Sequence, residues 1–133
     1  MNLNRAIELA RRRPLIKPRG SSSISRMVAI LTDGTSEFIG ENSYKSHPLV
    51  RYFTKRSEKI CRHAEADAVI KAVQYFTGKT GVRRKAFSDV SLEGFTLSIA
   101  RVLADGSTGL AKPCRDCDNM IRFFGIDTVE YIT

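Results

Sequence analysis

Several kinds of residue are scarce or missing in this 133-residue sequence. It has no tryptophan and only three cysteines, and no apolar stretch approaches the roughly 20 residues that a membrane-spanning helix needs. The small, odd number of cysteines excludes a disulfide framework, so these thiols are expected to bind metal or lie in a core. The N-terminus is basic and lacks the apolar stretch of a secretory signal. We therefore expect one cytoplasmic domain over residues 1–133, without a membrane partner.

The net charge of +8 is concentrated at the N-terminus. Residues 1–26 carry seven basic side chains against the single acidic Glu8. The basic residues are Arg5, Arg11, Arg12, Arg13, Lys17, Arg19 and Arg26. A basic patch suits a phosphorylated partner, because positive potential attracts anions and holds phosphates. The alternative is a solvated helix face and tail, and charge alone does not separate a nucleotide from a nucleic-acid backbone.

The N-terminal half predicts a helix followed by a hairpin. Residues 2–12 carry apolar side chains at helical spacing, so residues 1–25 are expected to form a basic helix and loop. The apolar run 27–31 predicts a buried strand. Because Asp33-Gly34 and a second apolar segment at 37–39 follow, the two segments are expected to pair as a β-hairpin.

The C-terminal half alternates helices with strands. Residues 64–77 and 115–124 predict helices, and 95–104 and 128–132 predict strands. The expected buried face of the first helix consists of Ala66, Val69, Ile70, Val73 and Phe76, and that of the second of Cys117, Met120, Ile121 and Phe124. Hairpin, helix, strand, helix and strand in this order predict an α/β fold, with helices packed on a sheet of four to five strands.

Two short segments carry metal-ligand chemistry. His63-Ala64-Glu65 stands at the start of one predicted helix, and Pro113-Cys114-Arg115-Asp116-Cys117 stands at the start of the other. Imidazole and thiolate are ligands that zinc prefers, and two cysteines three residues apart share one side of a helical turn. Catalytic zinc sites typically use three protein ligands and leave the fourth position to water. The sequence therefore predicts one zinc ion per chain, held by His63, Cys114 and Cys117.

Glu65 lies two residues after the predicted ligand His63, beside the metal rather than on it. Zinc and two helix N-termini together would lower the pKa of a bound water to about 7. A carboxylate at this position can take the water's proton, pass it to a ring nitrogen and then protonate a leaving amine. We therefore expect Glu65 to be the catalytic residue of a hydrolytic deamination.

The pairing of H-x-E with P-C-x-x-C is an already known signature of zinc-dependent nucleobase deaminases. On these residues the chain, from about Met27 to Ile132, resembles the cytidine deaminase-like superfamily, and within it the deoxycytidylate (dCMP) deaminases. The resemblance implies a three-layer α/β/α fold with a mixed sheet. It also implies His63, Cys114 and Cys117 as zinc ligands, Glu65 as the proton shuttle, and backbone around Ala64 at the border of the base.

Gly40-Glu41-Asn42 resembles the G-x-N segment of dCMP deaminases, in which the asparagine contacts the nucleotide. We expect Asn42 to bind the base or sugar, and Lys45 or His47 to bind a phosphate. The alternative is a polar turn in which these side chains serve only the backbone. The resemblance points to conversion of dCMP to dUMP with release of ammonia, by a homo-oligomer.

Three features depart from the family's usual pattern. The basic segment 78–94 makes the gap between the two motifs longer, and it either caps the site, reaches a neighbouring subunit, grips phosphate or is a solvated loop. The sequence ends at Thr133, directly after the last expected strand, so another subunit is expected to complete the site. Cys61 lies two residues before His63, and its sulfur would close the site as a four-ligand structural zinc. A passive buried thiol is the commoner case.

Two other functions stay open at this point. A polynucleotide deaminase would track a nucleic-acid backbone with the basic N-terminus and flip a base into the site. The sequence has no tryptophan, four tyrosines and seven phenylalanines, several of them on expected core faces. Few aromatic side chains are therefore expected as stacking platforms for a single strand, which argues against this function. A non-catalytic zinc module that binds nucleic acid is the second alternative, but it would have no use for Glu65.

Overall fold

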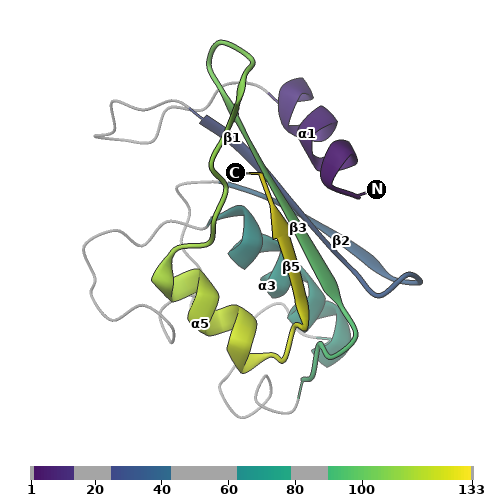
Figure 1. Ribbon diagram of the computed structural model, residues 1–133. Helices are drawn as coiled ribbons and strands as arrows, with labels where there is room; N and C mark the ends of the chain where they lie inside the picture. The colour runs from purple at the N-terminus through teal and green to yellow at the C-terminus, as the bar shows by residue number, and fades with distance from the viewer. Residues whose placement is uncertain (1, 14–24, 43–62, 79–89, 133) are drawn as a thin grey trace.

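The described residues of the computed structural model are 2–13, 25–42, 63–78 and 90–132 (Figure 1). They form three helices and five strands. In chain order these are α1 (Asn2–Arg12), β1 (Ser25–Thr32), β2 (Glu37–Glu41), α3 (Ala64–Thr77), β3 (Thr96–Leu103), β4 (Thr108–Gly109), α5 (Arg115–Phe123) and β5 (Thr128–Tyr131). None of the helices in these ranges has the length and apolar character needed to cross a membrane.

The five strands form one mixed sheet. β2 pairs with β1 and β1 pairs with β3, both antiparallel. The other edge of β3 carries β4 in antiparallel and β5 in parallel pairing. A parallel pair cannot be joined by a tight turn, and α5 lies in the connection that brings the chain back to β3. The expected α/β fold is therefore confirmed, with a mixed sheet of five strands.

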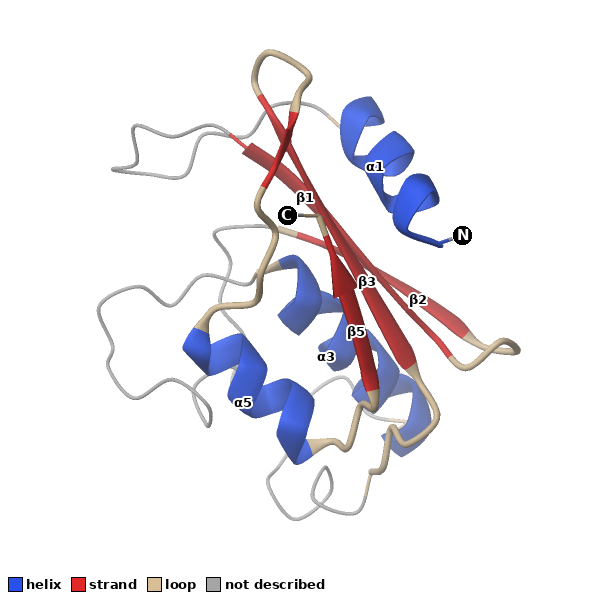
Figure 2. Ribbon diagram, viewed as in Figure 1, coloured by secondary structure: helices blue, strands red, loops and turns tan. Residues whose placement is uncertain are grey.

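Helices cover both faces of this sheet (Figure 2). Side chains alternate between the faces along a strand. Val28 and Ile30 of β1 pack against α1, whereas Ala29 and Leu31 belong to the core beneath α3 and α5. The described part of the chain is thus arranged in three layers, with α1 on one side and α3 and α5 on the other.

The boundaries of the predicted helices and strands agree with the observed ones to within two residues. One strand was missed, and one side chain was assigned to the wrong surface. The turn at Asp105-Gly106 leads into β4, a two-residue strand that the sequence did not predict. Phe76 was expected on the buried face of α3, and this was wrong, because its side chain is 47% exposed. It lies in the last turn of α3, where its ring contacts those of Phe38, Tyr75 and Phe95.

The last residues of the predicted insert 78–94 belong to the core. Leu92 is fully buried, and its backbone N–H donates to the Phe124 carbonyl at 2.7 Å. Val90 packs against the same core. At Val90 and Leu92 the segment is therefore packed rather than solvated, whereas Ser91, Glu93 and Gly94 are exposed. Residues 79–89 lie outside the described ranges.

Two of the N-terminal arginines are bound to the protein itself. Arg13, whose side chain is only 10% exposed, donates to the Asn42 side chain at 2.6 Å and pairs with Glu41 at 3.1 Å. Arg26 donates to the carbonyl oxygens of Arg11, Arg13 and Leu103. These two residues form neither a solvated face nor a free patch for a partner, because they fasten the end of α1 to the sheet. Lys17 and Arg19 lie outside the described residues.

Candidate metal centre

The predicted ligands stand at the first residues of two helices. His63 and Cys114 are the N-caps of α3 and α5, and both have extended backbone, with φ −72°, ψ 161° and φ −70°, ψ 170° respectively. Each carbonyl accepts the first helical hydrogen bond, from Asp67 at 2.9 Å and from Asp118 at 2.8 Å. The start of α3 and the start of α5 therefore bring their ligands to one place.

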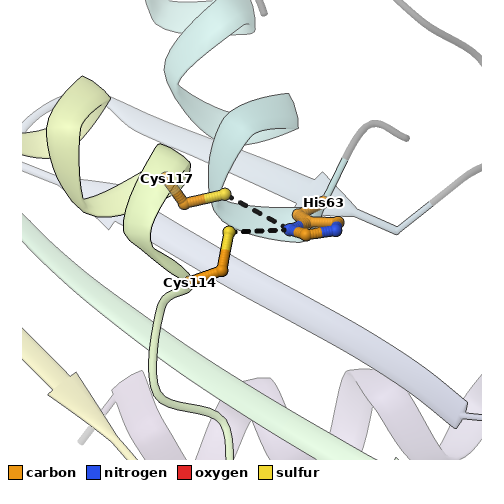
Figure 3. A group of neighbouring side chains, drawn as sticks. All are labelled: His63, Cys114 and Cys117. Carbon is orange, nitrogen blue, oxygen red and sulfur yellow. Dashed lines mark hydrogen bonds between the residues drawn. The ribbon is translucent and has the colours of Figure 1, made fainter. Parts of the chain in front are cut away.

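The three donor side chains converge as Figure 3 shows. His63 Nδ1 lies 3.5 Å from Cys114 Sγ and 3.3 Å from Cys117 Sγ, and the three donor atoms all lie within 4.8 Å of one another. A tetrahedral zinc ion with Zn–S of about 2.3 Å and Zn–N of about 2.0 Å would separate nitrogen and sulfur by about 3.5 Å. The donors thus lie close enough to hold one metal ion, and their spacing and chemistry fit zinc.

The pKa values of the three donor side chains are shifted by the contacts between them. The hydrogen bond with Cys117 holds the pKa of the Cys114 thiol well below its ordinary value, whereas the same bond, with burial, raises the pKa of Cys117. The hydrogen bond with Cys114 in turn raises the pKa of His63. Of the two thiols, Cys114 is therefore the one that loses its proton more readily. A bound metal ion would displace the proton of Cys117 as well.

Glu65 is a buried carboxylate next to these donors. It is 2% exposed, and its Oε1 lies 3.6 Å from His63 Nδ1. Burial raises the pKa of this carboxyl above its ordinary value. Its second oxygen, Oε2, is buried and has no hydrogen-bond partner. A buried polar atom without a partner costs about 1–3 kcal/mol, so a bound group that satisfies it is the natural explanation.

The first turn of α3 is fixed against β2 by a glycine. A Cβ on Gly40 would lie 2.1 Å from the Ala64 carbonyl oxygen and 2.4 Å from the Ala68 nitrogen. Both are backbone atoms, so a larger residue would push the helix away. His63 and Glu65 flank this contact, and hence Gly40 sets where the ligand and the carboxylate stand.

Asp67 and Lys71 tie the same helix to β2, and sequence reasoning missed both. The buried Asp67 carboxylate accepts from the Glu41 N–H at 2.9 Å and pairs with Lys71 at 3.3 Å. Lys71 Nζ also donates to the Ile39 carbonyl at 2.7 Å. The sequence does contain an indication of this role, because Asp67 is a carboxylate among neighbouring helix positions that are almost all apolar.

The predicted substrate contacts have different outcomes. Asn42 follows β2, and its Oδ1 accepts from the Met27 N–H at 2.9 Å as well as from Arg13. These bonds join Asn42 to the backbone of β1 and to a side chain after α1, and its contact with a nucleotide stays a prediction. Ala64 is fully buried at the contact with Gly40. Lys45, His47 and Cys61 lie outside the described residues.

Three donors and a carboxylate at two helix N-termini therefore define the candidate site. Within the described ranges, no second group of three His, Cys, Asp or Glu side chains lies close enough for a metal ion. Comparison of this chain with protein-family models, with curated proteins and with solved structures found no match.

Proposed function

We propose that the protein is a zinc-dependent hydrolytic deaminase of the cytidine deaminase-like superfamily. Its proposed substrate is a cytosine nucleotide, and the reaction converts dCMP to dUMP and ammonia. One observation carries the proposal: the Glu65 carboxylate is buried beside the donor set and keeps one oxygen unpartnered. A structural zinc site needs no adjacent carboxylate, whereas deamination needs a residue that carries protons.

The residues of the chain divide the work between binding and proton transfer. His63, Cys114 and Cys117 would hold the ion, and zinc, when bound, lowers the pKa of a water in its fourth position to about 7. Glu65 takes a proton from the attacking water as the oxygen bonds to C4 of cytosine. It delivers that proton to N3, then takes the remaining proton from the new C4 hydroxyl and delivers it to the amino group, so that the C4–N bond breaks, the C4=O bond forms and ammonia leaves.

The surroundings of Glu65 suit this task. Burial raises its carboxyl pKa and thereby makes it a better proton acceptor than an exposed glutamate. The N-termini of α3 and α5 place partial positive charge at the site, which favours the thiolate of Cys114 and would favour that of Cys117 once a metal is bound. A buried proton acceptor therefore lies beside donors that can carry negative charge.

The first test is ammonia release by the purified zinc protein, with dCMP, deoxycytidine, AMP and a cytosine-containing single strand offered side by side. Turnover of dCMP or deoxycytidine supports the proposal. Turnover of the strand alone would instead identify a polynucleotide deaminase and give the basic N-terminus a role in binding. Tightly bound zinc without turnover of any substrate would reject catalysis and favour a structural site.

Glu65→Gln tests the carboxylate itself. Because glutamine keeps the shape but carries no proton between sites, we expect kcat to fall by about 10²–10⁴-fold, with zinc content and the unfolding transition unchanged. Glu8→Gln on the exposed side of α1 is the matched control and should keep full activity. Retained turnover in Glu65→Gln would contradict the mechanism.

A further inference from the structure

An arginine lies on the face of the sheet that carries the metal centre. Leu97 and Ile99 of β3 belong to the core beneath α3 and α5, and Arg101 follows in the same alternation. Its Cα partner on β1 is Met27, which packs against the same core. Arg101 is thus a charged residue at a position whose neighbours on that face are apolar, and this break in the alternation is visible in the sequence.

The guanidinium of Arg101 has no partner among the described residues. Its Nε is buried without a hydrogen bond, and no hydrogen bond or ion pair joins the side chain to a described residue. Arg13 and Arg26 are part-buried as well, but Arg13 pairs with Glu41 and Arg26 donates to three carbonyl oxygens. Arg115 likewise has no hydrogen bond or ion pair to the described residues, but it is exposed to water. Arg26 also has a buried Nε without a partner, but its terminal nitrogens are bonded, whereas Arg101 makes no such bond within the described ranges. Since a partly buried charge is costly unless paired, Arg101 is the arginine that most needs a partner.

Arg101 also lies in the sheet between Asn42, the predicted substrate residue, and the segment that leads to the metal ligand Cys114. Asn42, Met27, Arg101 and Gly109 form one row across the sheet. A Cβ on Gly109 would lie 3.7 Å from Arg101 Cδ, so the arginine stem lies beside this glycine, where no side chain intervenes. After β4 the chain continues within a few residues to α5, whose N-cap is the metal ligand Cys114.

We infer that Arg101 binds the phosphate of a nucleoside monophosphate whose base reaches Glu65. The inference rests on the proposed function and names a specificity-determining residue for it. A guanidinium presents a planar fork of N–H donors that matches phosphate oxygens, and the partly buried position strengthens the contact. The phosphate would supply the charge partner that the described part of the chain does not provide.

Steady-state kinetics with dCMP and deoxycytidine test this assignment. In Arg101→Gln we expect the KM for dCMP to rise by about tenfold or more, the effect of losing one charge-assisted contact. The kcat/KM for deoxycytidine should stay unchanged, which also shows that the variant is folded. Arg101→Lys should recover part of the loss. Arg122→Gln, which removes an exposed charge on α5, should leave both substrates unaffected.

Other outcomes would overturn the inference and leave the deaminase intact. One is an equal kcat/KM of the wild-type protein for dCMP and deoxycytidine. A second is an equal fall in kcat/KM for both substrates in Arg101→Gln. A third is a fall in kcat/KM for dCMP in Arg115→Gln but not in Arg101→Gln. Absence of turnover with every substrate would reject the proposed function instead. Binding of inorganic phosphate, followed by 31P NMR, then decides: binding that Arg101→Gln abolishes supports an anion site, and no binding to wild type overturns it.

Discussion

The two faces of the sheet are built differently. On the α1 side the core is a small cluster of apolar residues: Ala6, Ala10, Val28, Ile30, Ala100 and Val102. On the other side the core is larger, and the helix α3 that covers it buries two acidic residues, Glu65 at 2% and Asp67 at 5% exposure. The α1 face also buries one polar side chain, Ser98, but its hydroxyl donates to the Glu130 carboxylate at 2.6 Å. The α3 face differs in that it buries two carboxylates, and one of them is incompletely paired.

The two buried acids show what this difference means. Asp67 is compensated, because a backbone N–H and Lys71 contact its carboxylate. Glu65 keeps an oxygen without a partner. Burial of an uncompensated polar group lowers stability, so a fold retains one where a bound group makes use of it. We therefore expect changes on the α3 face to act on metal binding and turnover, and changes on the α1 face to act on stability alone.

Cys114→Ser should have the largest effect. Serine is a poor zinc ligand, so the variant should lose stoichiometric zinc and, with it, all turnover, as metal analysis and the ammonia assay would show. Cys61→Ser is the matched control, and a site with three protein ligands predicts that it keeps its zinc. Zinc that stays bound in Cys114→Ser would contradict the ligand assignment. Zinc lost in Cys61→Ser would reveal a closed site with four ligands.

Gly40→Ala should have the next largest effect. The added Cβ meets backbone atoms of α3 and displaces the helix that carries His63 and Glu65. A shift of about 1 Å in a catalytic group can lower kcat by about 10²-fold. We expect a fall of that order together with weaker zinc binding, measured by kinetics and by competition with a chelator. Urea unfolding of the same variant separates this from loss of fold, and a wild-type kcat would show that Gly40 does not position the site.

The local patterns in the sequence predicted most of the elements and the donor set. Helical spacing and the Asp33-Gly34 turn act over a few residues, and so they identify α1, α3, α5 and the hairpin. The ligands were predictable for a similar reason. Cys114 and Cys117 lie within one turn, and His63 stands in its own short motif with Glu65.

Contacts between distant segments were not predictable in this way. Arg13 reaches Asn42, and Gly40 touches Ala64, over separations of more than twenty residues. Charge and composition indicate that such side chains exist, but only the three-dimensional arrangement shows which group each one meets. For that reason the sequence suggested that the N-terminal arginines form a free basic surface, although Arg13 and Arg26 bind groups of the protein itself.

Ile30→Val on the α1 face should have the smallest effect. Removing one methylene from a fully buried side chain costs about 0.5–1.5 kcal/mol of unfolding free energy, measurable by urea denaturation. Because Ile30 packs toward α1, kcat and zinc affinity should not change. Ile70→Val makes the same change within α3, on the face of the metal centre. If Ile70→Val lowers kcat while both variants lose the same unfolding free energy, packing beneath α3 helps to position the catalytic groups. If Ile30→Val lowers kcat as much, the sheet transmits strain between its faces, and the division between packing and function fails.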